Sequence, residues 1–299
     1  KFKNNNQMTR KFETLSVYKH SDEPCITIVS LNRPKKLNAI GSKMWIEIGE
    51  VFETIASDGS YDCRCVILTG KGRSFCAGLD TSDTTLGLIP NDESGTKNEE
   101  VDVARRMISF KPKILEMQRC FSALEKCPVP VVAAIQGHCI GAGVDLITAA
   151  DIRICDTSAK FSVREVKLGL AADVGVLQRL PKVVGHSSRI RELCFTGEDF
   201  DAHEAYRIGL VSRVCENSQM LLNTAIEIGQ KIVRNSPVAV VGTKQNLLYS
   251  RDHSVEDGLD MIATHNSGAL MTNDIMLSFM NKQNQSPDNF TRLLPRSKL

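Results

Sequence analysis

Three carboxylates stand close behind a glycine-rich turn in the middle of the chain, at Asp145, Glu165 and Asp173. The turn, Gly141-Ala142-Gly143, follows the apolar run 131–135, and a short apolar run bounded by chain breakers is typical of a buried strand. The apolar residues after the turn indicate the start of a helix, whose free N–H groups favour negative charge. A turn that can hold an oxyanion, followed by acids that can move protons, indicates carbanion chemistry next to a carbonyl group.

A second glycine turn, Ala77-Gly78-Leu79-Asp80, follows another strand-like run at 65–69. If the two turns lie side by side, each offers one backbone N–H group to a single oxygen atom and together they form an oxyanion hole. Losing one donor of such a hole costs on the order of 10²–10³ in rate. Either turn taken alone is better explained as a simple reversal of the chain, because glycine motifs are weak signals.

Each carboxylate also has a structural explanation. Asp145 lies in the first turn of the expected helix, where the helix dipole favours a negative charge. Asp173 precedes an apolar segment and could be an N-cap, and Glu165 could pair with its neighbour Arg164 in solvent. Asp173 is less easily explained in this way, because a lone acid among apolar residues is expected to have a raised pKa.

A rival interpretation starts from Cys139 in the segment Gly137-His-Cys-Ile-Gly141. A strand, a G-x-C-x-G turn and a helix resemble the nucleophile elbow of α/β-hydrolases with cysteine in place of serine. The alternative for Cys139 is a small buried residue. The histidines that could complete a triad all lie downstream, at His186, His203, His253 and His265.

Strands and helices alternate along most of the sequence, and helices alone follow, which predicts an α/β core with a C-terminal helical region. The expected strands are Cys25–Leu31, Cys65–Thr69, Val131–Ile135 and Leu210–Val214. The expected helices are Ser42–Ile55, Val101–Lys126, Ser187–Phe195, a short one after Asp201, and a helical stretch from Ser236-Pro237 to about Met280. Ser42, Asp201 and Ser236 are the expected N-caps, and 81–98 reads as a long polar loop.

The composition is that of a globular protein, with 299 residues, 42% hydrophobic residues and 24% charged residues. The net charge of +2 and the scattered basic residues argue against a nucleic-acid partner, and no apolar run approaches the roughly 20 residues of a membrane helix. Ten cysteines without a C-x-x-C pair are expected to be reduced, mostly buried thiols rather than zinc ligands. The basic start 1–7 reads as a remnant or a disordered arm before Met8.

The last three residues are Ser297-Lys298-Leu299, the peroxisomal address that an import receptor reads at a C-terminus. A polar tract precedes them. We therefore expect the protein in a peroxisome or a peroxisome-related organelle.

These motifs together resemble those of the enoyl-CoA hydratase/isomerase (crotonase) superfamily. The likeness runs from about Phe12 to Thr272, and within the superfamily the chain is most similar to the Δ3,5-Δ2,4-dienoyl-CoA isomerases. The motifs that carry it are Leu31-Asn-Arg-Pro34, Ser74-Phe-Cys-Ala-Gly-Leu-Asp80, Gly137 to Asp151, Arg164-Glu-Val166, Gly169 to Gly175, Leu177 to Lys182, Gly209 to Val214 and Asn246 to Val255.

The resemblance implies a spiral of β-β-α turns and an acyl-CoA site at 12–205, C-terminal helices for trimer contacts at 206–280, and a polar targeting tail at 281–299. It implies a homo-oligomer, a trimer or a dimer of trimers. The implied substrate is a 3,5-dienoyl-CoA thioester, converted to the 2,4-diene in fatty-acid β-oxidation without a metal or cofactor, since coenzyme A is part of the substrate.

The resemblance also implies roles for single residues. Glu165 would act at C2 and Asp173 at C6, with Asp145 in support, although the assignment of acid to carbon stays open. The backbone N–H groups of Leu79 and Ala142 would form the oxyanion hole. The implied substrate-binding residues are Ala77, Gly78, Leu79, Asp80, Thr81 and Ala142.

One position departs from the family pattern, and two others separate the competing functions. Ala142 stands where the family usually has glycine, which leaves the N–H group available but narrows the site. A plain hydratase usually has Glu where Asp145 stands and Gly where Asp173 stands, so both positions favour isomerisation. The competing interpretations are an enoyl-CoA hydratase and a non-catalytic acyl-CoA-binding or RNA-binding member of the same fold.

Overall fold

The computed structural model describes residues 11–57, 62–83, 102–282 and 285–293. Its centre is a six-stranded sheet in the order β1-β2-β3-β4-β6-β9, in which β1 is antiparallel to β2 and the other neighbours are parallel. The predicted α/β class is confirmed. The strands are β1 Leu15–Lys19, β2 Ile26–Leu31, β3 Cys65–Gly70, β4 Val131–Ile135, β6 Ile152–Asp156 and β9 Val214–Cys215.

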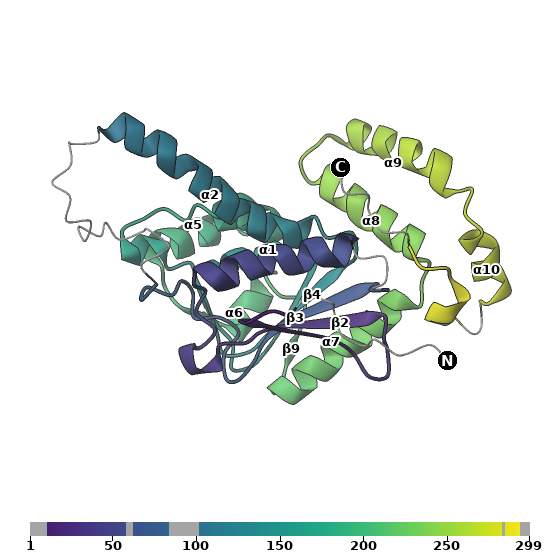
Figure 1. Cartoon of the computed structure of the whole chain (residues 1–299), viewed down its shortest axis with the longest axis horizontal. Coiled ribbons are helices and arrows are strands. Elements are labelled where there is room, and N and C mark those ends of the chain that lie inside the picture. Colours follow the sequence, from purple (N-terminus) through teal and green to yellow (C-terminus); the bar gives the residue numbers. More distant parts are fainter. Residues whose placement is uncertain (1–10, 58–61, 84–101, 283–284, 294–299) are drawn as a thin grey trace.

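The sheet is buried on both faces because α1 (Ser42–Ser57) covers one face and α7 (Ser218–Val233) covers the other (Figure 1). Successive strand side chains point to opposite faces. Val66 and Leu68 of β3 therefore pack in the cluster that contains α1, while Cys65 and Ile67 pack in the cluster that contains α7. This double burial explains why the central strands are continuous apolar runs.

A second sheet of three short strands, β5 (His138–Ile140), β7 (Lys160–Ser162) and β8 (Phe200–Asp201), was not predicted. Segments of two or three residues are too short to show a period. β5 follows β4 and β7 follows β6, so successive turns of the chain add a strand to each sheet. A bridge between Cys76 and Cys139 brings the 74–80 segment beside β5. This arrangement is the expected spiral of β-β-α turns.

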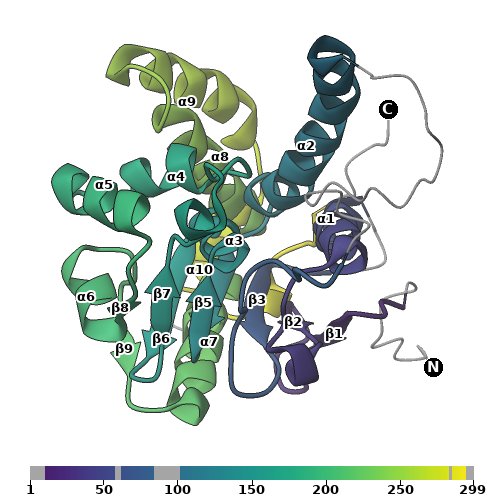
Figure 2. The same ribbon diagram turned by 90° about the vertical axis from the view of Figure 1, so that its left-hand side faces the viewer.

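The remaining helices surround this core. α2 extends away from the body at its N-terminal end (Figures 1 and 2), and α8 to α10 lie together on the right in Figure 1. None of the helices that the structure describes is long and apolar enough to cross a membrane. Their bounds are α2 Val103–Glu125, α3 Ala142–Thr148, α4 Val176–Val183, α5 Ser187–Thr196, α6 Ala202–Arg207, α8 Pro237–Ser250, α9 Val255–Ala269 and α10 Asp274–Met280.

The predicted helix caps have different outcomes. The carboxylate of Asp201 accepts a hydrogen bond from Glu204 N at 2.8 Å, and Ser236 Oγ accepts one from Ala239 N at 3.3 Å, as predicted. Ser42 is instead the first residue of α1, and its N–H donates to Asp83 Oδ2 at 2.7 Å. A cap supplied from so far along the chain leaves no local sequence signal.

The expected strand Leu210–Val214 was mostly wrong, because only Val214–Cys215 pairs with β6. Leu210 and Val211 are buried in the core as loop residues, and a short apolar run does not distinguish these states. After residue 205, β9 joins the main sheet and α7 packs on it.

Some predictions fall outside the described residues. These are the basic start 1–7, most of the polar loop 81–98, and the tripeptide 297–299. All ten cysteines lie in the described part and none forms a disulfide bond; nine of them are buried.

Candidate active site

A cavity of about 560 Å³ opens where the two glycine turns meet. The turns are in direct contact, because a Cβ atom on Gly78 would lie 3.0 Å from Ile140 O and one on Gly143 would lie 3.0 Å from Cys76 Cβ. Side chains at these two positions would separate the turns. Most of the predicted site residues line this cavity: Ala77, Gly78, Leu79, Thr81, Ala142, Glu165 and Asp173.

The two predicted oxyanion donors, Leu79 N and Ala142 N, belong to residues of this lining. On either side of Leu79, Ile40 N donates to Gly78 O at 2.8 Å and Asp80 N donates to Ile40 O at 2.9 Å. Ala142 is the first residue of α3, and the first N–H groups of a helix have no partner within the helix. Among the hydrogen bonds of the described residues, neither amide donates to a protein acceptor.

Glu165 begins a short 3-10 helix, Glu165–Leu168, shortly after β7. Its carboxylate lies against the turn, since a Cβ atom on Gly141 would be 3.0 Å from Glu165 Oε1. Burial raises the pKa of Glu165. Arg164 forms its ion pair with Asp199, so the interpretation of Glu165 as a solvated partner of Arg164 is wrong.

Asp145 lies behind Glu165, fully buried on α3, and does not line the cavity. Its Oδ1 accepts a hydrogen bond from Val176 N at 2.6 Å, and the rest of its carboxyl group lies buried beside the carboxyl group of Glu165. Burial and the neighbouring Glu165 raise the pKa of Asp145 well above its usual range. Two buried carboxylates side by side repel each other, so one proton shared between Asp145 and Glu165 would stabilise the pair.

Asp173 lies in the segment between the 3-10 helix and α4, at the exposed edge of the cavity. Partial burial raises its pKa, as expected for an acid among apolar residues. It is not an N-cap, because the N-cap position of α4 is Gly175 and the N–H of Val176 is bound by Asp145. The capping interpretation of Asp173 is therefore wrong.

Asp80 also lies outside the cavity lining. Its carboxylate accepts hydrogen bonds from Ser82 Oγ at 2.5 Å and from Arg33 Nη2 at 2.8 Å, and a hydrogen bond from Ser82 is the main cause that lowers its pKa. The side chain of Asp80 thus holds the turn in place, while its neighbours Leu79 and Thr81 line the cavity.

The apolar wall of the cavity was missed. It includes Trp45 from α1 and Phe110 and Met117 from α2. Residues seven apart on a helix share a face, so this spacing was visible in the sequence but indicated only packing. His138 also lines the cavity, with its Nδ1 atom 3.1 Å from Ser74 Oγ.

The rival interpretation of Cys139 as a nucleophile is wrong. Its side chain has no exposed surface, and burial raises the pKa of the thiol well above its usual value. A reactive cysteine needs a lowered pKa and access to substrate.

Gly141 offers a test of the contact with Glu165. Its φ of 50° favours glycine, so Gly141→Ala is expected to cost about 1–3 kcal/mol in the free energy of unfolding and to displace the Glu165 carboxylate. Gly169→Ala is the matched control, because Gly169 also has a positive φ, 79°, but a Cβ atom there would meet nothing within 4 Å. Chemical unfolding and activity assays should show that both variants lose stability and that only Gly141→Ala loses most of its activity.

A model of the enoyl-CoA hydratase/isomerase family matches residues 22–264. The chain is 46% identical over 270 residues to the mitochondrial Delta(3,5)-Delta(2,4)-dienoyl-CoA isomerase of Rattus norvegicus, covering 89% of this chain and 79% of that one. The peroxisomal protein of the same activity name from Arabidopsis thaliana is 40% identical, with 88% and 92% covered. A crystal structure of an enoyl-CoA hydratase from Bacillus anthracis superposes with a TM-score of 0.77 at 28% identity, over 95% of this chain and 99% of that one.

Proposed function

The chain belongs to the enoyl-CoA hydratase/isomerase family, and we propose that it converts 3,5-dienoyl-CoA thioesters to 2,4-dienoyl-CoA thioesters in fatty-acid β-oxidation. The observation that carries the proposal is the grouping of two separate acids, Glu165 and Asp173, around one cavity that also contains the two glycine turns. A double-bond shift over several carbons needs a base at one position and an acid at another.

The first step is removal of a proton from C2. Glu165, left ionised by its protonated neighbour Asp145, takes this proton. The electron pair moves into the C1–C2 bond and onto the thioester oxygen, giving a dienolate that extends to C6. The N–H groups of Leu79 and Ala142 stabilise the oxygen, as donors placed where charge develops do in other enzymes.

The second step is protonation at C6. Asp173 donates its proton there, the remaining double bonds shift by one carbon each, and the 2,4-diene results. Its raised pKa favours the protonated form that this step requires. The site then returns to its starting state when Glu165 loses and Asp173 regains a proton through solvent. Coenzyme A enters as part of the substrate, and the steps use no metal or redox cofactor.

A direct comparison of substrates tests the activity. The purified protein should convert 3,5-dienoyl-CoA to a product with the ultraviolet absorbance of a conjugated 2,4-dienoyl thioester. Its rate of adding water to 2-enoyl-CoA should be much lower. Rapid hydration of 2-enoyl-CoA without dienoyl isomerisation would instead identify a hydratase.

We also propose a homo-oligomer, a trimer or a dimer of trimers, that uses the C-terminal helices. Large apolar side chains on α9 and α10 and between them are solvent-exposed in the single chain, and exposed apolar surface is a common feature of contact sites. They include Leu259, Leu270, Met271, Met276 and Phe279.

Delivery to peroxisomes is proposed from the tripeptide Ser297-Lys298-Leu299, with the Arabidopsis thaliana relative, named as peroxisomal, in support. A fluorescent protein fused to the last ten or so residues is expected to enter peroxisome-type organelles, and removal of Leu299 should leave the 299-residue chain in the cytosol. Microscopy of both forms checks this prediction. Import that continues unchanged without Leu299 would contradict it.

A further inference from the structure

The segment that carries Asp173 makes no backbone–backbone hydrogen bonds to the part of the chain that the structure describes. Among the described residues, no backbone–backbone hydrogen bond involves Ala171 to Val174. The segment connects the 3-10 helix at Glu165–Leu168 with α4. Because an acid that donates to a single carbon atom needs a fixed position, something other than backbone pairing must hold Asp173.

Side chains from three helices provide these contacts. Gln118 Nε2 on α2 donates to Asp173 O at 2.6 Å, and Arg179 Nη1 on α4 donates to Val174 O at 3.4 Å. Two residues further, Val176 N donates to Asp145 Oδ1 on α3 at 2.6 Å. The polar contacts of this segment thus come from side chains that belong to the surrounding helices.

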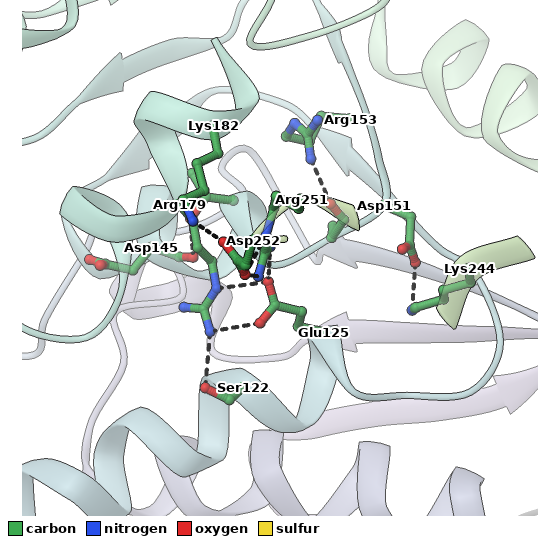
Figure 3. A network of polar contacts seen from close by, with 12 residues as sticks. Ser122, Glu125, Asp145, Asp151, Arg153, Arg179, Lys182, Lys244, Arg251 and Asp252 are labelled. Carbon is green, nitrogen blue, oxygen red and sulfur yellow. Dashed lines mark hydrogen bonds and ion pairs between the residues drawn. The ribbon is translucent and has the colours of Figure 1, made fainter. Parts of the chain in front are cut away.

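Arg179 is itself held firmly. It is only 9% exposed, and its guanidinium group donates to Ser122 Oγ at 2.9 Å and to both carboxylate oxygens of Glu125 at 3.1 and 3.2 Å (Figure 3). A two-pronged contact of this kind fixes the plane of the guanidinium group. Glu125 also pairs with Arg251, at the end of α8.

Gly175 lets the guanidinium group approach the segment. A Cβ atom on Gly175 would lie 1.9 Å from Arg179 Nη1, so any larger residue would push one of them away. On α2, the residues that hold the segment and Arg179 are Gln118, Ser122 and Glu125. Their spacing of four and three places them on one face of the helix.

We propose that Gln118 and Arg179 are positioning residues that hold Asp173 at the distance from Glu165 required for proton delivery to C6. They act through the backbone of the segment and not through the substrate. This proposal rests on the proposed function, because it presumes that Asp173 serves C6 and Glu165 serves C2.

Gln118→Met tests the proposal, because methionine keeps the length of the side chain and removes the donor. The variant should turn over 3,5-dienoyl-CoA about 10²-fold more slowly, the scale expected when a catalytic group is displaced by about 1 Å. Its KM should stay close to that of the wild type. In D₂O it should still exchange the C2 proton of the substrate, because Glu165 and the oxyanion donors are untouched.

Arg119→Gln is the matched control on the same helix. Arg119 is exposed and pairs with Glu53 and Glu116 rather than with the segment, so this variant should behave as the wild type in both assays. Arg179→Lys is a second test. The lysine keeps a positive charge beside Glu125 but lacks the guanidinium group that donates to Val174 O. Like Gln118→Met, this variant should isomerise 3,5-dienoyl-CoA slowly and still exchange the C2 proton.

The outcomes distinguish the positioning role of Gln118 and Arg179 from the proposed isomerase function. Wild-type turnover in folded Gln118→Met and Arg179→Lys would overturn the positioning role alone. Equal losses of turnover and of C2 exchange would also overturn it, since they would indicate general damage to the site. A wild-type protein that neither exchanges C2 nor isomerises the diene would contradict the proposed function itself.

Discussion

Asp173→Asn is expected to lower the turnover of 3,5-dienoyl-CoA by about 10²-fold or more, the scale of general acid–base catalysis. Asparagine resembles aspartate in size but carries no titratable proton for C6. The fold should be preserved, because Asp173 is exposed and caps no helix, and such surface changes usually alter stability by less than about 0.5 kcal/mol.

Absorbance of the 2,4-dienoyl product measures this loss, with circular dichroism, oligomer size and thioester binding as controls. The pH profile gives a second readout. Asp173 acts in its protonated form, so wild-type activity should fall as the pH rises through its raised pKa. The residual activity of Asp173→Asn should lack this alkaline decline. Near-normal turnover in a folded Asp173→Asn variant would remove Asp173 from the mechanism and favour the hydratase interpretation.

Glu165→Gln is expected to abolish both turnover and exchange of the C2 proton, with a loss of about 10²–10⁴-fold. Glutamine cannot accept the proton that starts the reaction. Because Glu165 acts as the ionised base, wild-type activity should also fall as the pH drops through its pKa, which burial raises. NMR of the substrate in D₂O measures the exchange directly.

Asp173→Asn is the control for Glu165→Gln when C2 exchange and isomerisation are compared in both variants. Asp173→Asn should retain C2 exchange while losing isomerisation, whereas Glu165→Gln should lose both. If Glu165→Gln still exchanges C2 and Asp173→Asn does not, the two acids have the reverse assignment.

The sequence predicted the parts of the fold that depend on local patterns. The strands β2, β3 and β4 and the helix α1 were found because each buries a long apolar run or stripe. The strands β5, β7 and β8 were missed because two or three residues show no period. The Asp83 contact at the start of α1 was missed because its partner is distant in sequence.

The same division applies to the site. The two glycine turns and the acids Glu165 and Asp173 were predicted from motifs and line one cavity. The contact between Asp145 and the N–H of Val176 was not predictable. It depends on how α3 meets α4, which is set by tertiary packing. Gln118 gave no signal, and Arg179 appeared only as part of the Leu177 to Lys182 motif without a role of its own, because a polar residue on a helix usually faces solvent.

The position of deuterium in the product tests the two-acid mechanism most directly. The wild-type protein would isomerise 3,5-dienoyl-CoA in D₂O, and mass spectrometry and NMR of the earliest 2,4-dienoyl-CoA would locate the label. If Glu165 takes the C2 proton and a solvent-exchanged Asp173 supplies C6, the first product carries deuterium at C6. Protium at C6, transferred from C2 by a single group, would contradict the mechanism, as would a hydrated product in place of the 2,4-diene.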